Sequence, residues 1–344
     1  MTVALSPKDR PPLVVAEVSG NHNGSLERAH AIVDMVADAG APAIKFQTYT
    51  ADTITIDHDG PGFVIGADHE LWGGRRLYEL YVEAHTPWEW HEELFAHARE
   101  RGLVPFSSPF DVTAIELLES LDAELYKIAS LEIGDLPLLR EVARTGKPVV
   151  LSNGAATLAD IALAIETIRA VGENPITLLA CTSSYPASPS ESNLRSIPTL
   201  RDAFGVDVGL SDHTPGIGVA VASVAFGATL IEKHVTLSRA DGGVDSDFSL
   251  EGDELAALCR ESAIAWEALG SAVPQITDGE RQSLRLRRSL YVVRDVRAGE
   301  IVDESTVRSI RPAGGLPPAE LDAVLGRSFT RDVARGTPLS WDLL

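Results

Sequence analysis

Short apolar runs alternate with longer amphipathic segments over the first 270 residues of the chain. In segments such as 26–39 and 158–170 apolar residues recur at helical spacing, whereas the runs are nearly continuous in Val, Ile, Leu and Ala. Eight runs have the length of a strand, at residues 13–19, 43–49, 103–109, 125–130, 148–153, 176–183, 207–213 and 229–236. Eight strands that alternate with helices predict an α/β fold, a (β/α)8 TIM barrel.

The alternation of strand-length runs and helical segments ends before residue 287. Short β-rich stretches follow at 289–293 and 307–310, with turn residues at 297–300 and 313–318. We therefore predict four parts: an N-terminal extension (1–12), the barrel (13–270), a linker (271–286) and a small β-rich domain (287–344).

Every apolar run ends in polar residues. In a barrel of this kind the C-terminal ends of the strands form the active site. Residues two apart share one face of a strand, so Lys45 with Gln47 and Glu232 with His234 point inward together. Lys45, Lys127 and several hydroxyls at one mouth suit a phosphate, because ammonium and hydroxyl donors replace the water around its oxygens.

Two of the runs end in histidine, at residues 213 and 234. Only about one strand and helix separate them, which places His213 and His234 at the same end of neighbouring strands. Imidazole is a common protein ligand of borderline divalent metals. The pair therefore predicts a metal site with open positions for substrate; the alternative is two polar strand ends satisfied by the backbone.

Two loops at this end of the barrel allow two interpretations each. The long connection 50–85 suits a polar sugar or a surface excursion, and it carries Phe63, Trp72, Arg75, Arg76 and Tyr78. The stretch 21–24 either caps the following helix through an Asx turn or contacts substrate.

Composition narrows the function. The net charge of −21 argues against nucleic-acid or anionic-membrane partners. The negative charge lies almost entirely before residue 286, because residues 286–344 hold 9 Lys and Arg against 8 Asp and Glu. Residues 1–12 lack a signal-peptide pattern, and the longest uncharged apolar stretch, 216–231, is too short to span a membrane. Cys181 and Cys259 cannot build a disulfide framework, so we expect a cytoplasmic protein with reduced thiols.

Several ordered motifs resemble the sialic acid synthase family. They are AEVSGNHNG (16–24), KFQT (45–48), FSSPF (106–110), YKIAS (126–130), LSDHT (210–214) and EKH (232–234). The resemblance runs from about residue 13 to 344 and includes a C-terminal antifreeze-like (SAF) domain. Residues 71–90, 241–243 and 335–343 look most like the pseudaminic acid synthase branch.

The resemblance implies condensation of phosphoenolpyruvate with an open-chain amino sugar, which gives a nine-carbon 2-keto acid and phosphate. In the pseudaminic branch the sugar is a 2,4-diacetamido-2,4,6-trideoxy hexose; N-acetylneuraminate or legionaminate synthesis is the alternative. His213 and His234 would bind a divalent metal, Mn²⁺ or else Mg²⁺ or Co²⁺, and would act with Glu17 in catalysis. The matching phosphoenolpyruvate positions are Lys45, Ser108, Lys127, Ser130, Ser152, Ser183 and Ser211. The matching sugar positions are Asn21, Gln47, Arg75, Glu132, Tyr185, Asp245 and Arg311.

The chain departs from the family pattern at three positions. Asn153 stands where many members have Thr, Ser183 where sialic acid synthases have Asn, and Asp247 where the pseudaminic branch often has Ala. Ser183 offers a shorter reach than an amide, which weakens its assignment as a ligand. The resemblance also implies a domain-swapped homodimer in which Arg311 reaches the partner's barrel.

Two other classes of function compete with this interpretation. A Schiff-base aldolase would use Lys127 or Lys233 as a nucleophile. A non-catalytic sugar-binding protein would use the C-terminal domain as its recognition surface, but it would have no need of the histidine pair.

Overall fold

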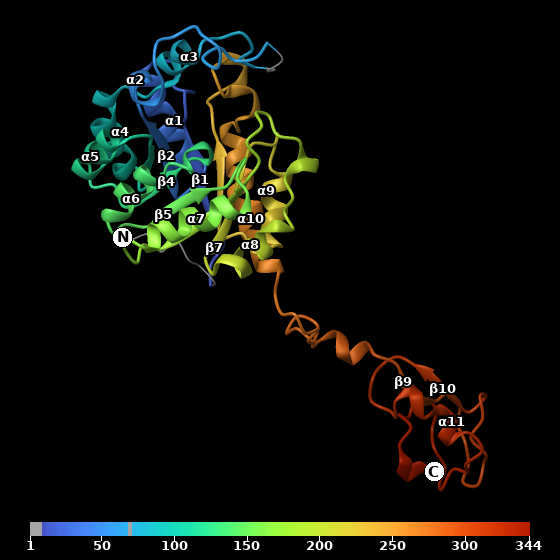
Figure 1. The fold of residues 1–344 in the computed structure, drawn as a ribbon. Coiled ribbons are helices and arrows are strands. Elements are labelled where there is room, and N and C mark those ends of the chain that lie inside the picture. Colours follow the sequence, from blue (N-terminus) through green and yellow to red (C-terminus); the bar gives the residue numbers. More distant parts are fainter. Residues whose placement is uncertain (1–8, 68–70) are drawn as a thin grey trace. The chain divides into compact units, whose positions relative to one another are not determined.

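The computed structural model describes residues 9–67 and 71–344 (Figure 1). Eight parallel strands form one closed barrel in chain order, and β8 returns to pair with β1. The strands are β1 (Leu13–Glu17), β2 (Ala43–Thr48), β3 (Val104–Pro109), β4 (Tyr126–Ile128), β5 (Val149–Ser152), β6 (Ile176–Cys181), β7 (Asp207–Asp212) and β8 (Leu230–His234). The predicted TIM barrel is confirmed.

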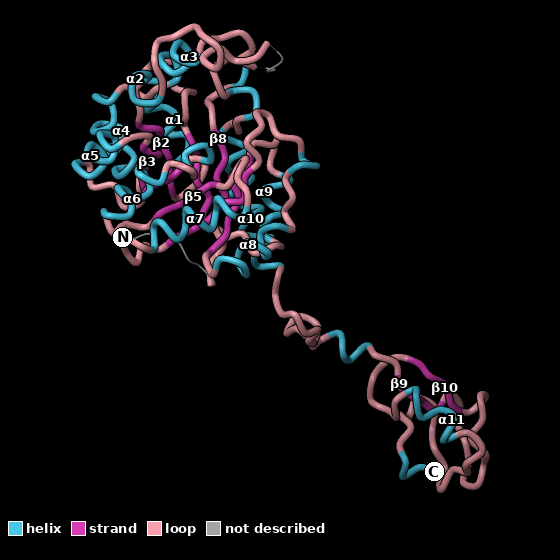
Figure 2. The backbone as a smooth tube through the Cα atoms, in the orientation of Figure 1, coloured by secondary structure: helices cyan, strands magenta, loops and turns pink. Residues whose placement is uncertain are grey.

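Helices follow the strands and surround the barrel (Figures 1 and 2). They are α1 (Leu26–Asp38), α4 (His91–Glu100), α5 (Val112–Ser120), α6 (Leu136–Arg144), α7 (Leu158–Arg169), α8 (Ser196–Phe204), α9 (Gly218–Val224) and α10 (Gly252–Ala268). Side-chain caps at Ser25, Asp111, Asp135 and Thr157 accept backbone N–H groups and fix four of the helix starts.

The apolar core of the barrel unit has two parts. The larger lies between the strands and the helices. The smaller fills the inside of the barrel with Val15, Ala43, Phe106, Leu125, Val150, Leu179 and Leu230. This inner cluster fills the barrel interior, and the polar side chains of the cavity lie beyond it, where the strands end.

The long connection after β2 has structure of its own. It forms α2 (Ala51–Ile54) and α3 (Leu77–Ala84), and the short helix η1 (Trp88–Trp90) leads into α4. His91 holds this return to the barrel, because its Nε2 lies 2.8 Å from the hydroxyl of Thr48 on β2. Other single-turn helices are η2 (Ser130–Glu132), η3 (Pro189–Glu191), η4 (Arg239–Asp241) and η5 (Ser246–Phe248).

Residues 271–344 form a second compact unit, which we describe by itself. It contains η6 (Ser283–Leu286), an antiparallel pair of β9 (Ser289–Val292) and β10 (Val307–Ile310), η7 (Pro318–Glu320), α11 (Leu321–Val324) and η8 (Trp341–Leu343). Its separate core includes Leu290, Val292, Val307, Phe329 and Leu339.

Two predictions concern the chain ends and membranes. Residues 1–8 of the predicted N-terminal extension (1–12) lie outside the described residues. Among the helices of residues 9–67 and 71–344, none combines the length and apolarity needed to cross a bilayer.

Candidate active site

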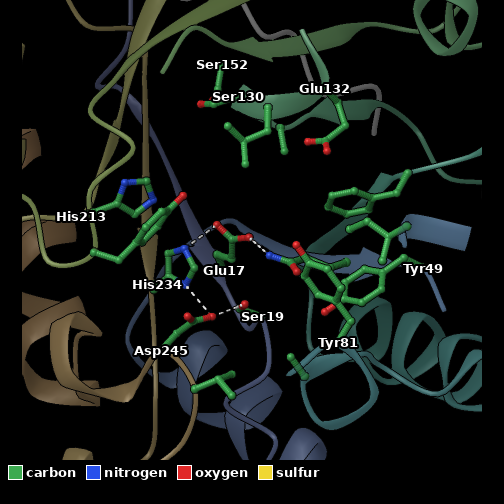
Figure 3. A pocket seen from close by; sticks show the side chains of 18 of the residues that line it. Glu17, Ser19, Tyr49, Tyr81, Ser130, Glu132, Ser152, His213, His234 and Asp245 are labelled. Carbon is green, nitrogen blue, oxygen red and sulfur yellow. Dashed lines mark hydrogen bonds and ion pairs between the residues drawn. The ribbon is translucent and has the colours of Figure 1, made fainter. Parts of the chain in front are cut away.

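A cavity of about 240 Å³ opens at the C-terminal ends of the strands (Figure 3). Its polar lining comes from many strands and the loops after them: Glu17, Ser19, Lys45, Gln47, Lys127, Ser130, Glu132, Ser152, Cys181, Tyr185, Ser211, His213, Glu232, His234 and Asp245. Twelve of the seventeen residues predicted for the site lie on this wall. The alternation of inward and outward side chains along each strand brings them together.

Four buried charges form the floor of the cavity. Nζ of Lys45 lies 3.0 Å from Glu17 and 3.1 Å from Glu232. Nζ of Lys127 lies 3.0 Å from the other oxygen of Glu232, which also accepts a hydrogen bond of 2.9 Å from Ser211. Each ammonium therefore has a carboxylate partner, as buried charges require.

The pKa values of these groups follow from burial and pairing. Burial disfavours the charged form of Glu17, but His234 and Lys45 hold its pKa well below the usual range. Burial lowers the pKa of Lys127, because Glu232 only partly offsets the loss of water and the nearby charge of Lys45. Burial also disfavours the charged form of Glu232, but Lys127 and Lys45 hold its pKa below the usual range, so Glu17 and Glu232 are both ionised at neutral pH.

The two predicted metal ligands are neighbours. The ring centres of His213 and His234 lie 5.3 Å apart. Nδ1 of His213 donates to the carbonyl oxygen of Thr182 at 3.0 Å, which leaves its Nε2 with a lone pair. Nε2 of His234 lies 3.1 Å from Glu17.

The donor set fits a cation with few protein ligands. Nδ1 of His234 is buried without a hydrogen bond among the described residues and lies 3.7 Å from a carboxylate oxygen of Asp245. Within residues 9–67 and 71–344, no group of three or more His, Cys, Asp or Glu side chains is arranged to hold a metal. A cation here would therefore rely on the two imidazoles and fill its other positions with water or substrate.

The predicted serines occupy different positions. Ser130, Ser152 and Ser211 line the cavity. The hydroxyls of Ser108 and Ser152 are buried without a partner among the described residues, so both have unused hydrogen-bonding capacity. Ser183 does not line the cavity; its hydroxyl lies 3.8 Å from the sulfur of Cys181.

The outer part of the cavity is largely apolar. Its wall comes from the connection 50–85 and neighbouring loops and contains Tyr49, Ile54, Ile65, Trp72, Leu77, Leu80, Tyr81, Ala84, Phe110, Leu131 and Val244. Glu132 lies on this wall, and burial raises its pKa to about 7. Trp72 was expected here and is present, but Phe63, Arg76 and Tyr78 do not line the cavity.

Three predicted sugar contacts have other surroundings. Asn21 is fully buried and donates to Val235 and Ser249 in the loop after β8, so it joins two loops and does not line the cavity. Arg75 pairs with Glu83 on α3 and also lies off the cavity. Arg311 is exposed in the second unit.

Glu232, Cys181 and Ser19 also line the cavity, although no role in binding or catalysis was predicted for them. The two-residue spacing of Glu232 and His234 indicates that both side chains face the inside of the barrel, so Glu232 could have been predicted from the sequence. Burial opposes ionisation of the Cys181 thiol, yet His213 and Ser130 lower its pKa to about 7. Nothing in the sequence around Ser19 distinguishes it from other polar strand ends.

Lys233, one of the two lysines open to a Schiff-base role, points away from the cavity. It is buried, pairs with Asp212 at 3.2 Å and does not line the cavity. A nucleophilic lysine must reach the substrate, so this side chain is unsuited to that role.

An eight-stranded parallel barrel with two lysines, three serines and two imidazoles in a cavity at its mouth defines a protein of the (β/α)8 enzyme class. The chain belongs to the NeuB family, whose model matches residues 32–274. A SAF domain model matches residues 287–344, which agrees with the predicted C-terminal domain class.

Individual relatives are similar over nearly the whole chain. A pseudaminic acid synthase from Helicobacter pylori is 40% identical over 97% of this chain and 98% of that protein. An N,N'-diacetyllegionaminic acid synthase from Campylobacter jejuni is 35% identical over 93% and 96%. The crystal structure of an N-acetylneuraminic acid synthetase from Leptospira borgpetersenii, in complex with citrate, matches with a TM-score of 0.71 at 32% identity, covering 80% of this chain and 90% of that one.

Proposed function

We propose that the chain is a pseudaminic acid synthase, which condenses phosphoenolpyruvate with a 2,4-diacetamido-2,4,6-trideoxy hexose. One observation carries the proposal: two buried lysines, three serines and an imidazole pair share one cavity with a large apolar wall. The higher identity to a pseudaminic than to a legionaminic acid synthase, 40% against 35%, supports this branch.

The lysine end of the cavity suits phosphoenolpyruvate. Lys45 and Lys127 supply positive charge, and Ser130, Ser152 and Ser211 supply hydroxyl donors beside them. Phosphoenolpyruvate would compete with Glu232 for both ammonium groups, so binding exchanges one set of ion pairs for another. The hydroxyl of Ser152 has no partner to give up.

His213 and His234 would hold a divalent cation, which we propose to be Mn²⁺ or a similar ion. When bound, the cation polarises the aldehyde oxygen of the open-chain sugar. The carbonyl of Thr182 fixes the ring of His213, and Glu17 fixes that of His234, so both imidazoles are oriented before substrate arrives.

Glu17 is the best placed group to handle a proton. Its carboxylate is ionised, lies in the cavity and also accepts a hydrogen bond of 2.8 Å from Gln47. The C2=C3 electrons of phosphoenolpyruvate form the bond to the aldehyde carbon, the aldehyde π bond breaks, its oxygen takes up a proton, and C2 is left electron-poor. Water then adds to C2 and gives its proton to Glu17. The tetrahedral C2 becomes a ketone as its bond to the phosphate oxygen breaks and phosphate leaves.

The apolar wall favours the trideoxy sugar. A methyl and two acetamido methyl groups present more apolar surface than the hydroxyls of N-acetylmannosamine, and Tyr49, Leu80 and Tyr81 offer matching contacts. Glu132, with a pKa of about 7, can donate a hydrogen bond to an amide oxygen when protonated. A legionaminate precursor differs only in stereochemistry and is the second candidate.

We further propose a domain-swapped homodimer in which the SAF domain of one subunit serves the barrel of the other. Leu131 lines the cavity yet is 77% exposed, so this wall lacks a cover within the barrel unit. Arg311 is exposed and has no ion pair among the described residues, which suits a guanidinium that binds sugar oxygens in the partner's site.

A phosphate-release assay with phosphoenolpyruvate and a panel of amino sugars tests the proposal. We expect release that requires divalent metal and the diacetamido sugar, with a nine-carbon keto acid as co-product. Borohydride trapping of a pyruvate adduct on Lys127, with activity in chelator, would instead support the aldolase. Sugar binding without phosphate release from any member of the panel would support a non-catalytic binding protein.

A further inference from the structure

The loop after β1 and the loop after β8 are joined by side chains. Residues 18–24 form the first, here named the β1 loop, and residues 235–249 form the second, the β8 loop. The amide of Asn21 donates to the carbonyl oxygen of Val235 at 2.9 Å and to the hydroxyl of Ser249 at 2.8 Å. Asn21 is fully buried, so these bonds replace contacts with water and fix the two loops together.

Two further contacts tighten the same junction. The amide of Asn23 donates to the carbonyl oxygen of Gly242 at 3.0 Å. Gly20 packs against Val244 so closely that a Cβ there would lie 2.4 Å from a Val244 methyl carbon. The β1 loop therefore has a defined seat on the β8 loop, and glycine is needed at position 20.

Both the backbone carbonyl and the side-chain carboxylate of Asp245, in the β8 loop, accept hydrogen bonds at this junction. The hydroxyl of Ser249 donates to its carbonyl oxygen at 2.6 Å. The hydroxyl of Ser19 donates to its carboxylate oxygen Oδ2, the same oxygen that lies 3.7 Å from His234 (Figure 3). Ser19 and Asp245 are buried and both line the cavity.

The backbone at Ser19 is unusual for a residue with a side chain. Its φ is +47°, in the left-handed region where glycine is favoured, and Asn23 in the same loop has a φ of +50°. A serine at such a position costs free energy relative to glycine, and here its side chain contacts a carboxylate of the cavity.

We infer that Ser19 is a positioning residue for the proposed synthase reaction: its hydroxyl fixes the Asp245 carboxylate beside His234, at the sugar end of the cavity. This rests on the proposed function. Without the hydroxyl, Asp245 can rotate about its side-chain bonds, and part of its interaction with the sugar is lost. Phosphoenolpyruvate, at the lysine end, would be unaffected.

Two glycine variants separate positioning from loop stability. Ser19→Gly and Asn23→Gly each remove a side chain at positive φ and one hydrogen bond to the β8 loop, and each removes the strain of a non-glycine residue there. The melting temperature of each variant is measured beside its activity. We expect Ser19→Gly to lower kcat/KM for the sugar roughly ten- to hundredfold. KM for phosphoenolpyruvate should stay unchanged, and Asn23→Gly should stay within about twofold of wild type.

Equal losses in both variants, or a loss in Ser19→Gly that follows its melting temperature, would overturn the inference. Failure of the proposed function is distinguishable, because the wild-type protein would then release no phosphate with any sugar. A crystal structure of Ser19→Gly adds a readout independent of activity. We expect the Asp245 carboxylate to be turned or disordered there; an unchanged Asp245 would refute the positioning role.

Discussion

Glu232 Oε1 lies 3.0 Å from Nζ of Lys127, and both side chains are almost completely excluded from solvent. The second oxygen of Glu232 pairs with Lys45 at 3.1 Å. One carboxylate therefore contacts both ammonium groups, with Glu17 as a second partner of Lys45, in a cavity that we propose binds a multiply charged anion. While the anion is absent, Glu232 offsets part of the cost of burying both ammonium groups.

We expect Glu232→Gln to lower the free energy of unfolding by about 3–5 kcal/mol, because it leaves buried positive charge under-compensated. Saturating phosphoenolpyruvate should restore part of this loss by supplying negative charge. Urea unfolding with and without phosphoenolpyruvate measures both effects.

Asp212→Asn is the matched control for Glu232→Gln. It breaks another buried pair, with Lys233, away from the cavity. Its loss of stability should show no extra rescue by phosphoenolpyruvate. Equal rescue of the two variants would contradict a direct competition between Glu232 and the anion.

The histidine pair can be tested by metal binding alone. We expect His213→Ala or His234→Ala to weaken Mn²⁺ binding at least about tenfold in isothermal titration calorimetry, because each removes one of two imidazole ligands. His30→Ala, on α1 and off the cavity, should bind like wild type. Unchanged binding in both cavity variants, or full activity in metal-free protein, would contradict the assignment.

Glu132 predicts a specific pH dependence of stability. Burial raises its pKa to about 7, against 4.5 for an ordinary glutamate. Between pH 4.5 and 7 the folded protein therefore holds a proton on Glu132 that the unfolded chain lacks. The contribution of this proton to the free energy of unfolding is complete below pH 4.5 and is lost as the pH rises through 7.

We therefore expect Glu132→Gln to raise the free energy of unfolding by about 3 kcal/mol at pH 8 and to change it little at pH 4.5. Denaturant unfolding at the two pH values checks this. The exposed Glu116→Gln provides the control. A gain in Glu132→Gln that is equal at both pH values would show that desolvation of the carboxylate is not its cause.

Subunit mixing tests the proposed dimer. Arg311→Ala and His213→Ala should each be inactive, whereas random heterodimers of the two contain one intact site and should restore about a quarter of wild-type activity. A mixture of His213→Ala with His234→Ala should restore none, because both barrels are then defective. Absence of rescue in mixtures that contain heterodimers would contradict a shared site.

The barrel and most of the cavity wall could be predicted because local patterns encode them. Strands buried on both faces produce continuous apolar runs, and two-residue alternation sets which polar strand ends face inward. Lys45, Lys127 and the two histidines were found in this way.

Contacts between loops could not be predicted in the same way. Asn21 and Ser249 are far apart in sequence, and no local spacing indicates that they bond. Arg75 sits in a connection whose sequence suits a sugar site or a surface segment equally, and the structure pairs it with Glu83. The resemblance placed Asn21 and Arg75 near the sugar, but the cavity wall contains neither of them.

The choice of sugar is the central claim, and catalytic efficiency tests it most directly. We predict that kcat/KM for the 2,4-diacetamido-2,4,6-trideoxy hexose of the pseudaminic pathway exceeds that for N-acetylmannosamine at least about tenfold, because a buried hydroxyl against the apolar wall would lack a partner. The legionaminate precursor, measured in parallel, should also be the poorer substrate. Equal or better use of N-acetylmannosamine, or of the legionaminate precursor, would contradict the account.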